Sequence, residues 1–224
     1  MPDKGGRTGL NVVMLSETFG AEELAGKAAA ICTKSSNPWN ALRHAIESGH
    51  ESVLEHVTFT FQIEGVSRAL LAQLTRHRIA SFSVQSQRYV DMGEMPMVIP
   101  KSITQDKELL NEFGTAMDAV KTFYRHAVEK GIPKEDARYA TPQACATSLV
   151  MTMNARELKH FFELRCCNRA QWEIRQLADQ MLILCKEKCP LIFGKAGPGC
   201  VSGYCHEKKP CDHPRCNEEP FNTF

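Results

Sequence analysis

The chain has 224 residues, 43% of them apolar and 24% charged, which are the proportions of an ordinary globular protein. Its formal net charge of +1 excludes a global electrostatic attraction to nucleic acid or to an anionic membrane surface. Since no apolar run reaches the roughly 18 residues of a membrane-spanning helix, and since the amino terminus lacks a hydrophobic signal region, we expect a cytoplasmic protein that binds neither membranes nor nucleic acid.

The first third of the sequence predicts two helices between two strands. Residues 10–14 are a short apolar run typical of a strand. Residues 21–33 and 38–48 combine helical spacing of their apolar positions with residues that favour helices. Residues 57–64 alternate β-branched and aromatic side chains, which makes them the clearest strand in the chain. We expect Gly65 to end that strand.

The remaining elements are predicted from the same two patterns, the helical spacing of apolar residues and the alternation typical of strands. The expected strands are residues 97–100 and 147–153, and the expected helices are residues 66–74, 106–130, 155–165 and 170–188. Asn154 precedes the third of these helices, and Glu157 follows it at the spacing of a capping arrangement.

Together these elements predict an α/β or α+β fold, with a mixed or antiparallel sheet and long helices in one domain, residues 1–193. The last stretch, residues 194–224, has a different composition, rich in Cys, Pro, Gly and charge and poor in large apolar residues. We expect it to be a separate, loosely ordered or metal-binding tail.

Basic side chains are concentrated in RHRIASFSVQSQRY, a segment that has no sustained period and is expected to be a loop. They are Arg76, His77, Arg78 and Arg88. No Asp or Glu occurs between residues 65 and 90. Because guanidinium groups bind phosphate in a bidentate way and serine hydroxyls add hydrogen bonds, the segment indicates a site for a phosphorylated small molecule. The alternative is a surface loop whose arginines pair with distant carboxylates.

A second group of polar side chains lies at the start of the helix predicted for residues 155–165. Arg156 and His160 are four residues apart and share one face, and Asn154 stands at the amino terminus. Free backbone N–H groups at such a terminus also favour an anion. Taken alone, Asn154 as a simple cap and His160 as a packing residue remain open, and Arg138 is ambiguous by itself.

A serine hydrolase is a different interpretation of the same residues. It would use Ser81 or Ser86 as nucleophile and His77 as base. Such a site needs a third group that orients the base. No G-x-S-x-G elbow is present, so this alternative is the weaker one.

The chain resembles the flavin-dependent thymidylate synthases. Their signature, Arg-His-Arg, seven residues and then Ser, matches Arg76, His77, Arg78, IASFSVQ and Ser86. Further matching segments are SGHESVLEH, QRYV, EDARYATPQ, MNARELKHFFELR and RAQWEIRQLA, in the same order along most of the chain.

The resemblance implies conversion of dUMP to dTMP, with methylenetetrahydrofolate as carbon donor and NADPH reducing a bound FAD. It implies hydride transfer from the flavin to the uracil without a covalent enzyme nucleophile. It further implies a homotetramer whose active sites are shared between subunits.

The resemblance also implies two sets of site residues. The dUMP set is Gln73, Arg76, Gln85, Ser86, Arg88, Arg138 and Arg165. The FAD set is His50, Ser52, Arg76, His77, Arg78, Val84, Asn154, Arg156 and His160. Arg165 and Ser86 would be catalytic, Arg165 by stabilising negative charge on the uracil and Ser86 as a polarising hydroxyl. Val84 replaces a residue that is often polar in the family, so it would contact the flavin through its backbone.

The carboxy-terminal stretch contains the spaced cysteines Cys200, Cys205, Cys211 and Cys216 with two histidines between them. Thiolates and imidazoles are zinc ligands, but the paired C-x2-C spacing of a zinc knuckle is missing. We therefore assign no metal to the chain. The cysteines are either free thiols or, as the alternative, ligands of a structural zinc ion. In the second case the chain could function as a zinc-stabilised binding module instead of an enzyme.

Overall fold

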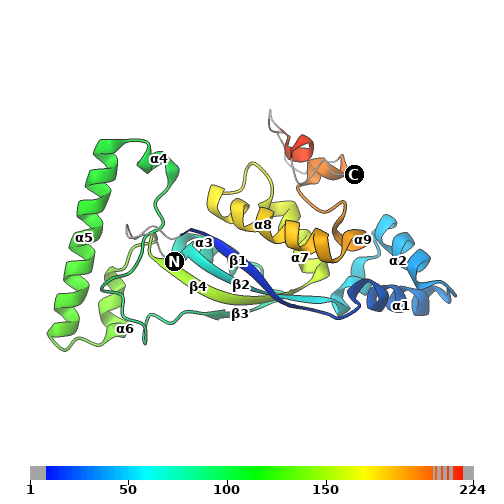
Figure 1. The fold of residues 1–224 in the computed structure, drawn as a ribbon, viewed down its shortest axis with the longest axis horizontal. Helices are drawn as coiled ribbons and strands as arrows, with labels where there is room; N and C mark the ends of the chain where they lie inside the picture. Colours follow the sequence, from blue (N-terminus) through cyan, green and yellow to red (C-terminus); the bar gives the residue numbers. More distant parts are fainter. Residues whose placement is uncertain (1–8, 204, 206–207, 209–210, 212–213, 219–224) are drawn as a thin grey trace. The chain divides into compact units, whose positions relative to one another are not determined.

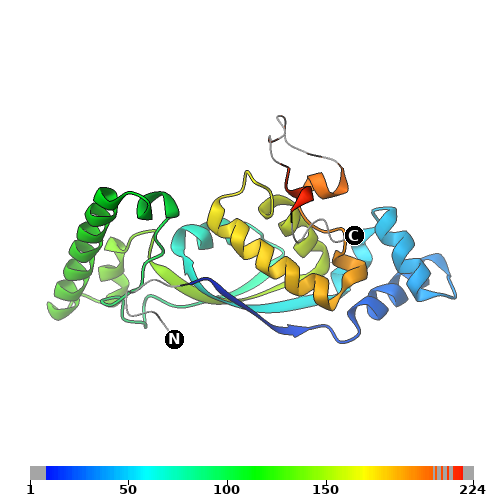
Figure 2. The ribbon, with the colours of Figure 1, turned by 45° about the horizontal axis from the view of Figure 1, so that its top comes forward.

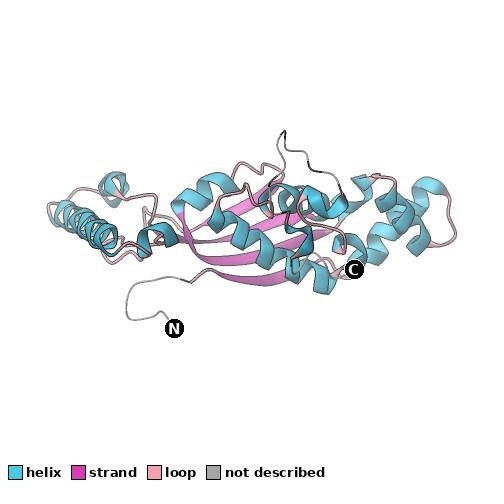
Figure 3. Cartoon of the chain, turned by 90° about the horizontal axis from the view of Figure 1, so that it is seen from above, coloured by secondary structure: helices cyan, strands magenta, loops and turns pink. Residues whose placement is uncertain are grey.

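The computed structural model of the chain describes residues 9–203, 205, 208, 211 and 214–218. The fold is α+β, with a four-stranded antiparallel sheet of strand order β1-β2-β4-β3 that is drawn in magenta in Figure 3. The strands are β1 (Asn11–Glu17), β2 (Thr58–Ser67), β3 (Ala80–Val84) and β4 (Ala146–Asn154). Of the fold classes and sheet types expected from the sequence, the structure shows α+β with an antiparallel sheet.

Close packing divides the described chain into two units, each assembled from segments that are distant in sequence. The first unit contains residues 9–11, 63–73 and 83–149, and the second contains residues 12–62 and 74–82 and those from 150 onward. No helix of the described residues is long and apolar enough to cross a membrane.

The first unit contains the long helix that the sequence predicts, α5 (Lys107–Glu129) (Figure 1). Asp106 caps it, because its carboxylate accepts hydrogen bonds from the N–H groups of Glu108 and Leu109. Tyr124 is the residue of α5 that is fully buried, in a cluster with three methionines, Met92, Met95 and Met97, and with Ala137 and Cys145. The other helical elements here are α3 (Arg68–Leu74), α4 (Lys101–Thr104), α6 (Lys134–Ala137) and η2 (Arg138–Ala140).

The second unit contains the helices that surround the candidate site. They are α1 (Ala21–Thr33), α2 (Pro38–Glu47), η1 (Glu51–His56), α7 (Ala155–Arg165), α8 (Trp172–Lys188), α9 (Pro190–Phe193), η3 (Gly199–Ser202) and η4 (Arg215–Asn217). Figures 1 and 2 show α7 and α8 over one face of the strands. Three aromatic rings join these layers, since Phe193 of α9 packs edge-on against Phe59 of β2 at 5.4 Å and against Phe162 of α7 at 6.0 Å.

Helices α1 and α2 pack very closely at Gly26. A Cβ atom at this position would come within 2.8 Å of the carbonyl oxygen of Pro38, the first residue of α2. Glycine therefore permits the approach of the two helices. This contact matters for the site because α2 supplies one of its walls.

The structure corrects the sequence predictions around the basic segment. Gly65 does not end β2, because the strand continues to Ser67 while Gly65 adopts a positive φ of 71°. Helix α3 accordingly starts at Arg68. The segment expected to be a loop contains β3, whose side chains alternate between partly buried and exposed. The expected strand at residues 97–100 is reduced to a single bridge between Met97 and Cys145.

Candidate active site

The start of α7 is fixed by β4 and by the residue that precedes β2. Asn154 is both the last residue of β4 and the cap of α7, and its Oδ1 accepts the N–H of Glu157 at 2.9 Å. The N–H of Ala155 donates to the carbonyl of Val57 at 2.7 Å. The predicted cap is confirmed. These two bonds also occupy N–H groups that the sequence suggested would be free for an anion.

His77 lies buried beside α7. Its Nδ1 is 2.9 Å from Oε1 of Glu157, and its Nε2 accepts a hydrogen bond from Nε–H of Arg165 at 3.1 Å. The ring also packs edge-on against Phe161 at 5.0 Å. Because Glu157 and Arg165 occupy both ring nitrogens, His77 has no role as the base of a Ser–His hydrolase.

Burial lowers the pKa of His77, and the hydrogen bond to Glu157 opposes that effect only in part. The charge of Arg165 lowers it further, so the imidazole is neutral at neutral pH. Burial also lowers the pKa of Arg165, and the nearby charge of Arg76 acts in the same direction. Neutral His77 thus offers Arg165 an acceptor without adding another positive charge.

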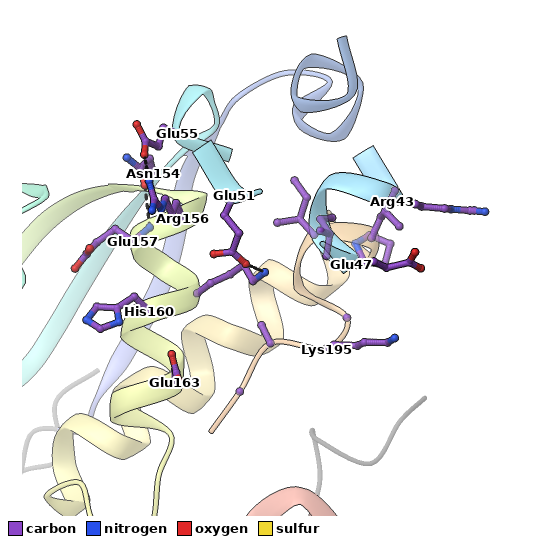
Figure 4. Close-up of a pocket in the computed structure, with 18 of the residues that line it drawn as sticks. Arg43, Glu47, Glu51, Glu55, Asn154, Arg156, Glu157, His160, Glu163 and Lys195 are labelled. Atoms are coloured by element: carbon purple, nitrogen blue, oxygen red, sulfur yellow. Dashed lines mark hydrogen bonds and ion pairs between the residues drawn. The ribbon is translucent and has the colours of Figure 1, made fainter. Parts of the chain in front are cut away.

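A pocket with a volume of about 1040 Å³ lies next to α7 and is bordered by η1, α2 and residues 190–199. Three residues of the predicted FAD set line it: Asn154, Arg156 and His160. Figure 4 shows these three residues along the amino-terminal part of α7. The pocket brings together segments 38–47, 51–56, 154–163 and 190–199, which are far apart in the sequence.

The pocket wall also contains charged residues that the sequence did not assign to a ligand site. They are Arg43, Glu47, Glu51, Glu55, Glu157, Lys159, Glu163 and Lys195. Arg156 forms an ion pair with Glu55, which Figure 4 marks with a dashed line, and Lys159 forms one with Glu51. The wall is therefore of mixed charge rather than purely cationic. Glu51 and Glu55 belong to SGHESVLEH, the segment that also contains the predicted FAD residues His50 and Ser52. The match of this segment to the family is the sequence signal that points to them.

The other predicted FAD residues lie outside the lining of this pocket as the described residues define it. Arg76 and Arg78 are exposed in the connection between α3 and β3, and His50 and Ser52 are exposed at the start of η1. Val84 ends β3 and is partly buried.

Several residues of the predicted dUMP set meet at Glu135 in the first unit. Nε of Arg88 is 2.7 Å from the Glu135 carboxylate, and Nε–H of Arg138 donates to the Glu135 carbonyl at 3.0 Å. Ser86 Oγ accepts the N–H of Arg88 at 3.2 Å. At Arg88 the structure therefore shows the pairing with a distant carboxylate that the sequence left open as the alternative.

Two glutamines of the predicted dUMP set, also in the first unit, form hydrogen bonds with backbone carbonyl groups. The side chain of Gln73 donates to the carbonyl of Ala69 at 3.3 Å. The N–H of Gln85 donates to the carbonyl of Ser148 at 2.9 Å, and the side chain of Gln85 is exposed. The last two members, Arg76 and Arg165, belong to the second unit.

The carboxy-terminal cysteines lie near the other end of α7. Cys200, Cys205 and Cys211 line a smaller pocket of about 430 Å³. Within the described part of the chain, no group of three or more His, Cys, Asp or Glu side chains is arranged to hold a metal ion. His206 and His213, which the alternative zinc site could use, lie outside the described residues.

Arg215 attaches this stretch to the rest of the second unit. Its guanidinium donates twice to the carboxylate of Asp179, at 3.0 and 2.9 Å. The same group donates to the carbonyl of Cys166 at 2.7 Å and to Glu218 at 3.0 Å. Cys166 follows Arg165 directly, so the tail holds the backbone next to that arginine.

Comparison with known proteins identifies the family. A family profile described as "Thymidylate synthase complementing protein" matches residues 13–191. A flavin-dependent thymidylate synthase of Geobacter sulfurreducens is 48% identical over 208 residues, covering 92% of this chain and 88% of that protein. One of Clostridium tetani is 40% identical over 232 residues, covering 91% and 93%. One of Pyrococcus abyssi is 51% identical over 170 residues, covering 72% and 70%. The chain belongs to the flavin-dependent thymidylate synthase family.

Proposed function

We propose that the protein converts dUMP to dTMP by reductive methylation, with FAD as cofactor and with methylenetetrahydrofolate and NADPH as co-substrates. The observation that carries the proposal is the pocket beside α7, whose wall includes Asn154, Arg156 and His160 in a chain of this family. The hydrogen bond between buried His77 and Arg165, the last residue of α7, supports it.

The pocket fits a flavin cofactor in size and in donor chemistry. A volume of about 1040 Å³ is at the upper end of the few hundred to about 1000 Å³ of small-molecule sites. Arg156 and Lys159 can donate to the FAD diphosphate, while Asn154 and His160 can bond polar edges of the ring. The partners of the two cations, Glu55 and Glu51, would have to release them for such contacts.

The proposed FAD residues remain His50, Ser52, Arg76, His77, Arg78, Asn154, Arg156 and His160, with the backbone of Val84. Lys159 joins them because it lines the same pocket. When bound there, a reduced flavin would supply the hydride that the uracil accepts. The chain's own residues bind and orient the ring and keep water from it.

The proposed dUMP residues are Gln73, Arg76, Gln85, Ser86, Arg88, Arg138 and Arg165. Arginines bind the phosphate, and the serine and glutamines bond to the ribose and the base. Arg165 stabilises negative charge on the uracil through its terminal amino groups, since its Nε is already bonded to His77. Ser86 polarises the substrate and forms no covalent bond.

We further propose a homotetramer with shared active sites, in which residues 1–193 form the catalytic domain. Light scattering on the purified protein tests the assembly. A mass of four chains supports it, and a monomer that is active at the same dilution contradicts it.

We expect purified protein supplied with FAD to be yellow and to oxidise NADPH faster when dUMP is added. Addition of methylenetetrahydrofolate should then yield dTMP, measured by chromatography. Visible absorption spectra with and without dUMP provide the first check, because a ligand close to the flavin shifts its bands. Protein that stays colourless after incubation with FAD and fails to bind dUMP would contradict the proposal.

Replacement of Arg88 by alanine is expected to weaken dUMP binding about 10- to 100-fold, since a hydrogen bond to a charged group contributes roughly 1.5–3 kcal/mol. The free energy of unfolding should fall by less than about 1 kcal/mol, because the pair with Glu135 is about half exposed on both sides. Calorimetric titration and urea unfolding measure the two effects.

Arg125→Ala is the matched control for Arg88→Ala. Arg125 also lies in the first unit and forms an exposed ion pair, with Glu94 at 3.2 Å, but has no proposed contact with the nucleotide. Its dUMP affinity should equal that of the unmodified protein. Equal affinities in both variants would disprove the phosphate role of Arg88.

A further inference from the structure

Glu157 is a buried carboxylate that the proposed sites leave without a role. Its side chain is only 10% exposed, and that of His77, its partner, is 4% exposed. Burying a carboxylate is costly unless it is hydrogen-bonded. The bond between Glu157 and Nδ1 of His77, at 2.9 Å, meets that requirement, so the two side chains need each other.

The two hydrogen bonds of His77 define which nitrogen carries its proton. A neutral imidazole has one N–H donor and one acceptor. Nε2 faces Nε–H of Arg165, which can only donate, so Nε2 is the acceptor and the proton is on Nδ1. The carboxylate of Glu157 accepts this Nδ1 proton, and it would repel the lone pair of the other tautomer.

The opposite tautomer would disrupt the position of Arg165. With its proton on Nε2, His77 would present an N–H to another N–H across 3.1 Å, and the guanidinium would have to move away. Protonated His77 would do the same and would add a charge next to Arg165. The neutral Nδ1–H form is therefore the one that holds Arg165 in the observed place.

We infer that Glu157 is a positioning residue, which fixes the tautomer of His77 and through it the guanidinium of Arg165. This inference rests on the proposed function for its catalytic consequence. The bond uses Nε of Arg165 and leaves the two terminal amino groups for contact with a substrate. Glu157 contacts neither the substrate nor the reacting atoms in this role, and acts across one imidazole ring.

Two substitutions of Glu157 separate this role from simple packing. Glu157→Gln removes the charge but keeps an oxygen that accepts the Nδ1 proton. Glu157→Leu has similar volume but no acceptor. We expect kcat to fall about 100-fold in Glu157→Leu, the size of effect that an ångström-scale displacement of a catalytic group produces, with little change in KM for dUMP. Glu157→Gln should stay within about threefold of the unmodified enzyme.

The tautomer itself is measured on ligand-free protein by nitrogen-15 NMR of the imidazole rings, with His77→Gln used to assign the signal. Unmodified protein and Glu157→Gln should show Nε2 without a proton and a slowly exchanging Nε–H of Arg165. In Glu157→Leu the proton should move to Nε2 and the Arg165 signal should exchange rapidly.

Several results would overturn the inference. One is a proton on Nε2 of His77 in the unmodified protein, which needs no variant to be folded. Another is a folded Glu157→Leu protein with the original tautomer, or with kcat equal to that of Glu157→Gln. If the unmodified protein instead shows the expected tautomer but makes no dTMP, the proposed function fails while the positioning of Arg165 by Glu157 stands.

Discussion

Replacement of Arg165 by lysine is expected to lower kcat for dTMP formation about 100- to 1000-fold, the loss typical of removing a preorganised donor from developing negative charge. Lysine keeps the positive charge but lacks both the planar fork and an Nε–H. The hydrogen bond to Nε2 of His77 at 3.1 Å would be lost, and a flexible ammonium would replace a fixed guanidinium.

Single-turnover measurement of dTMP formation checks this expectation, because it isolates the chemical step from product release. Arg169→Lys provides the control, since Arg169 is exposed four residues further along and has no proposed contact with the uracil. Its rate should remain within about twofold. An Arg165→Lys protein that turns over at the original rate would remove Arg165 from the catalytic residues.

Replacement of Phe193 by alanine is expected to lower the free energy of unfolding by about 3–5 kcal/mol, the usual cost of truncating a buried aromatic side chain. Phe193 is fully buried and packs against Phe59 and Phe162. It also holds α9 in place, and Leu191, Gly194 and Lys195 around it line the pocket beside α7. The same change should therefore weaken FAD binding.

Urea unfolding and a fluorescence titration with FAD measure the two consequences of Phe193→Ala. Phe19→Ala serves as the control, because Phe19 is fully exposed and surface truncations usually change stability by no more than about 0.5 kcal/mol. If Phe193→Ala left both stability and FAD affinity unchanged, the aromatic cluster would not be what fixes this wall of the pocket.

Local sequence patterns predicted the helices and most strands well because their determinants are local. Helix α1 matches the expected residues 21–33, and α5 falls within the expected residues 106–130. Asp106 and Asn154 both act as caps from the position just before their helices. Period and capping chemistry are encoded within a few residues.

The errors occur where distant segments decide the structure. Gly65 is compatible with a strand because its neighbours pair with other strands of the sheet, which a local pattern does not show. β3 is short, and its serines obscured the alternation of Ala80, Phe82 and Val84. Glu157 has the sequence position of a reciprocal cap, but its carboxylate bonds to His77, a residue 80 positions earlier.

The candidate site shows the same division. Asn154, Arg156 and His160 were predictable, and they line the pocket together because they occupy one end of a single helix. Three carboxylates of the site were not predictable: Glu135, which neutralises Arg88, and Glu51 and Glu55, which pair with cations of α7. Ion pairs between distant segments leave no periodic pattern in the sequence.

The guanidinium of Arg215 has a practical consequence for anyone who shortens the chain to its family-matching part. Deleting the last residues would remove the N–H groups of Arg215 that now donate to the carboxylate of Asp179 and to the carbonyl of Cys166. A truncated chain that stops near residue 193 therefore changes the surroundings of Arg165, and it also loses the part of the pocket wall formed by residues 194–199. Loss of activity in such a truncated chain would therefore reflect the loss of residues that hold the site in place, and would not show that a catalytic residue is missing.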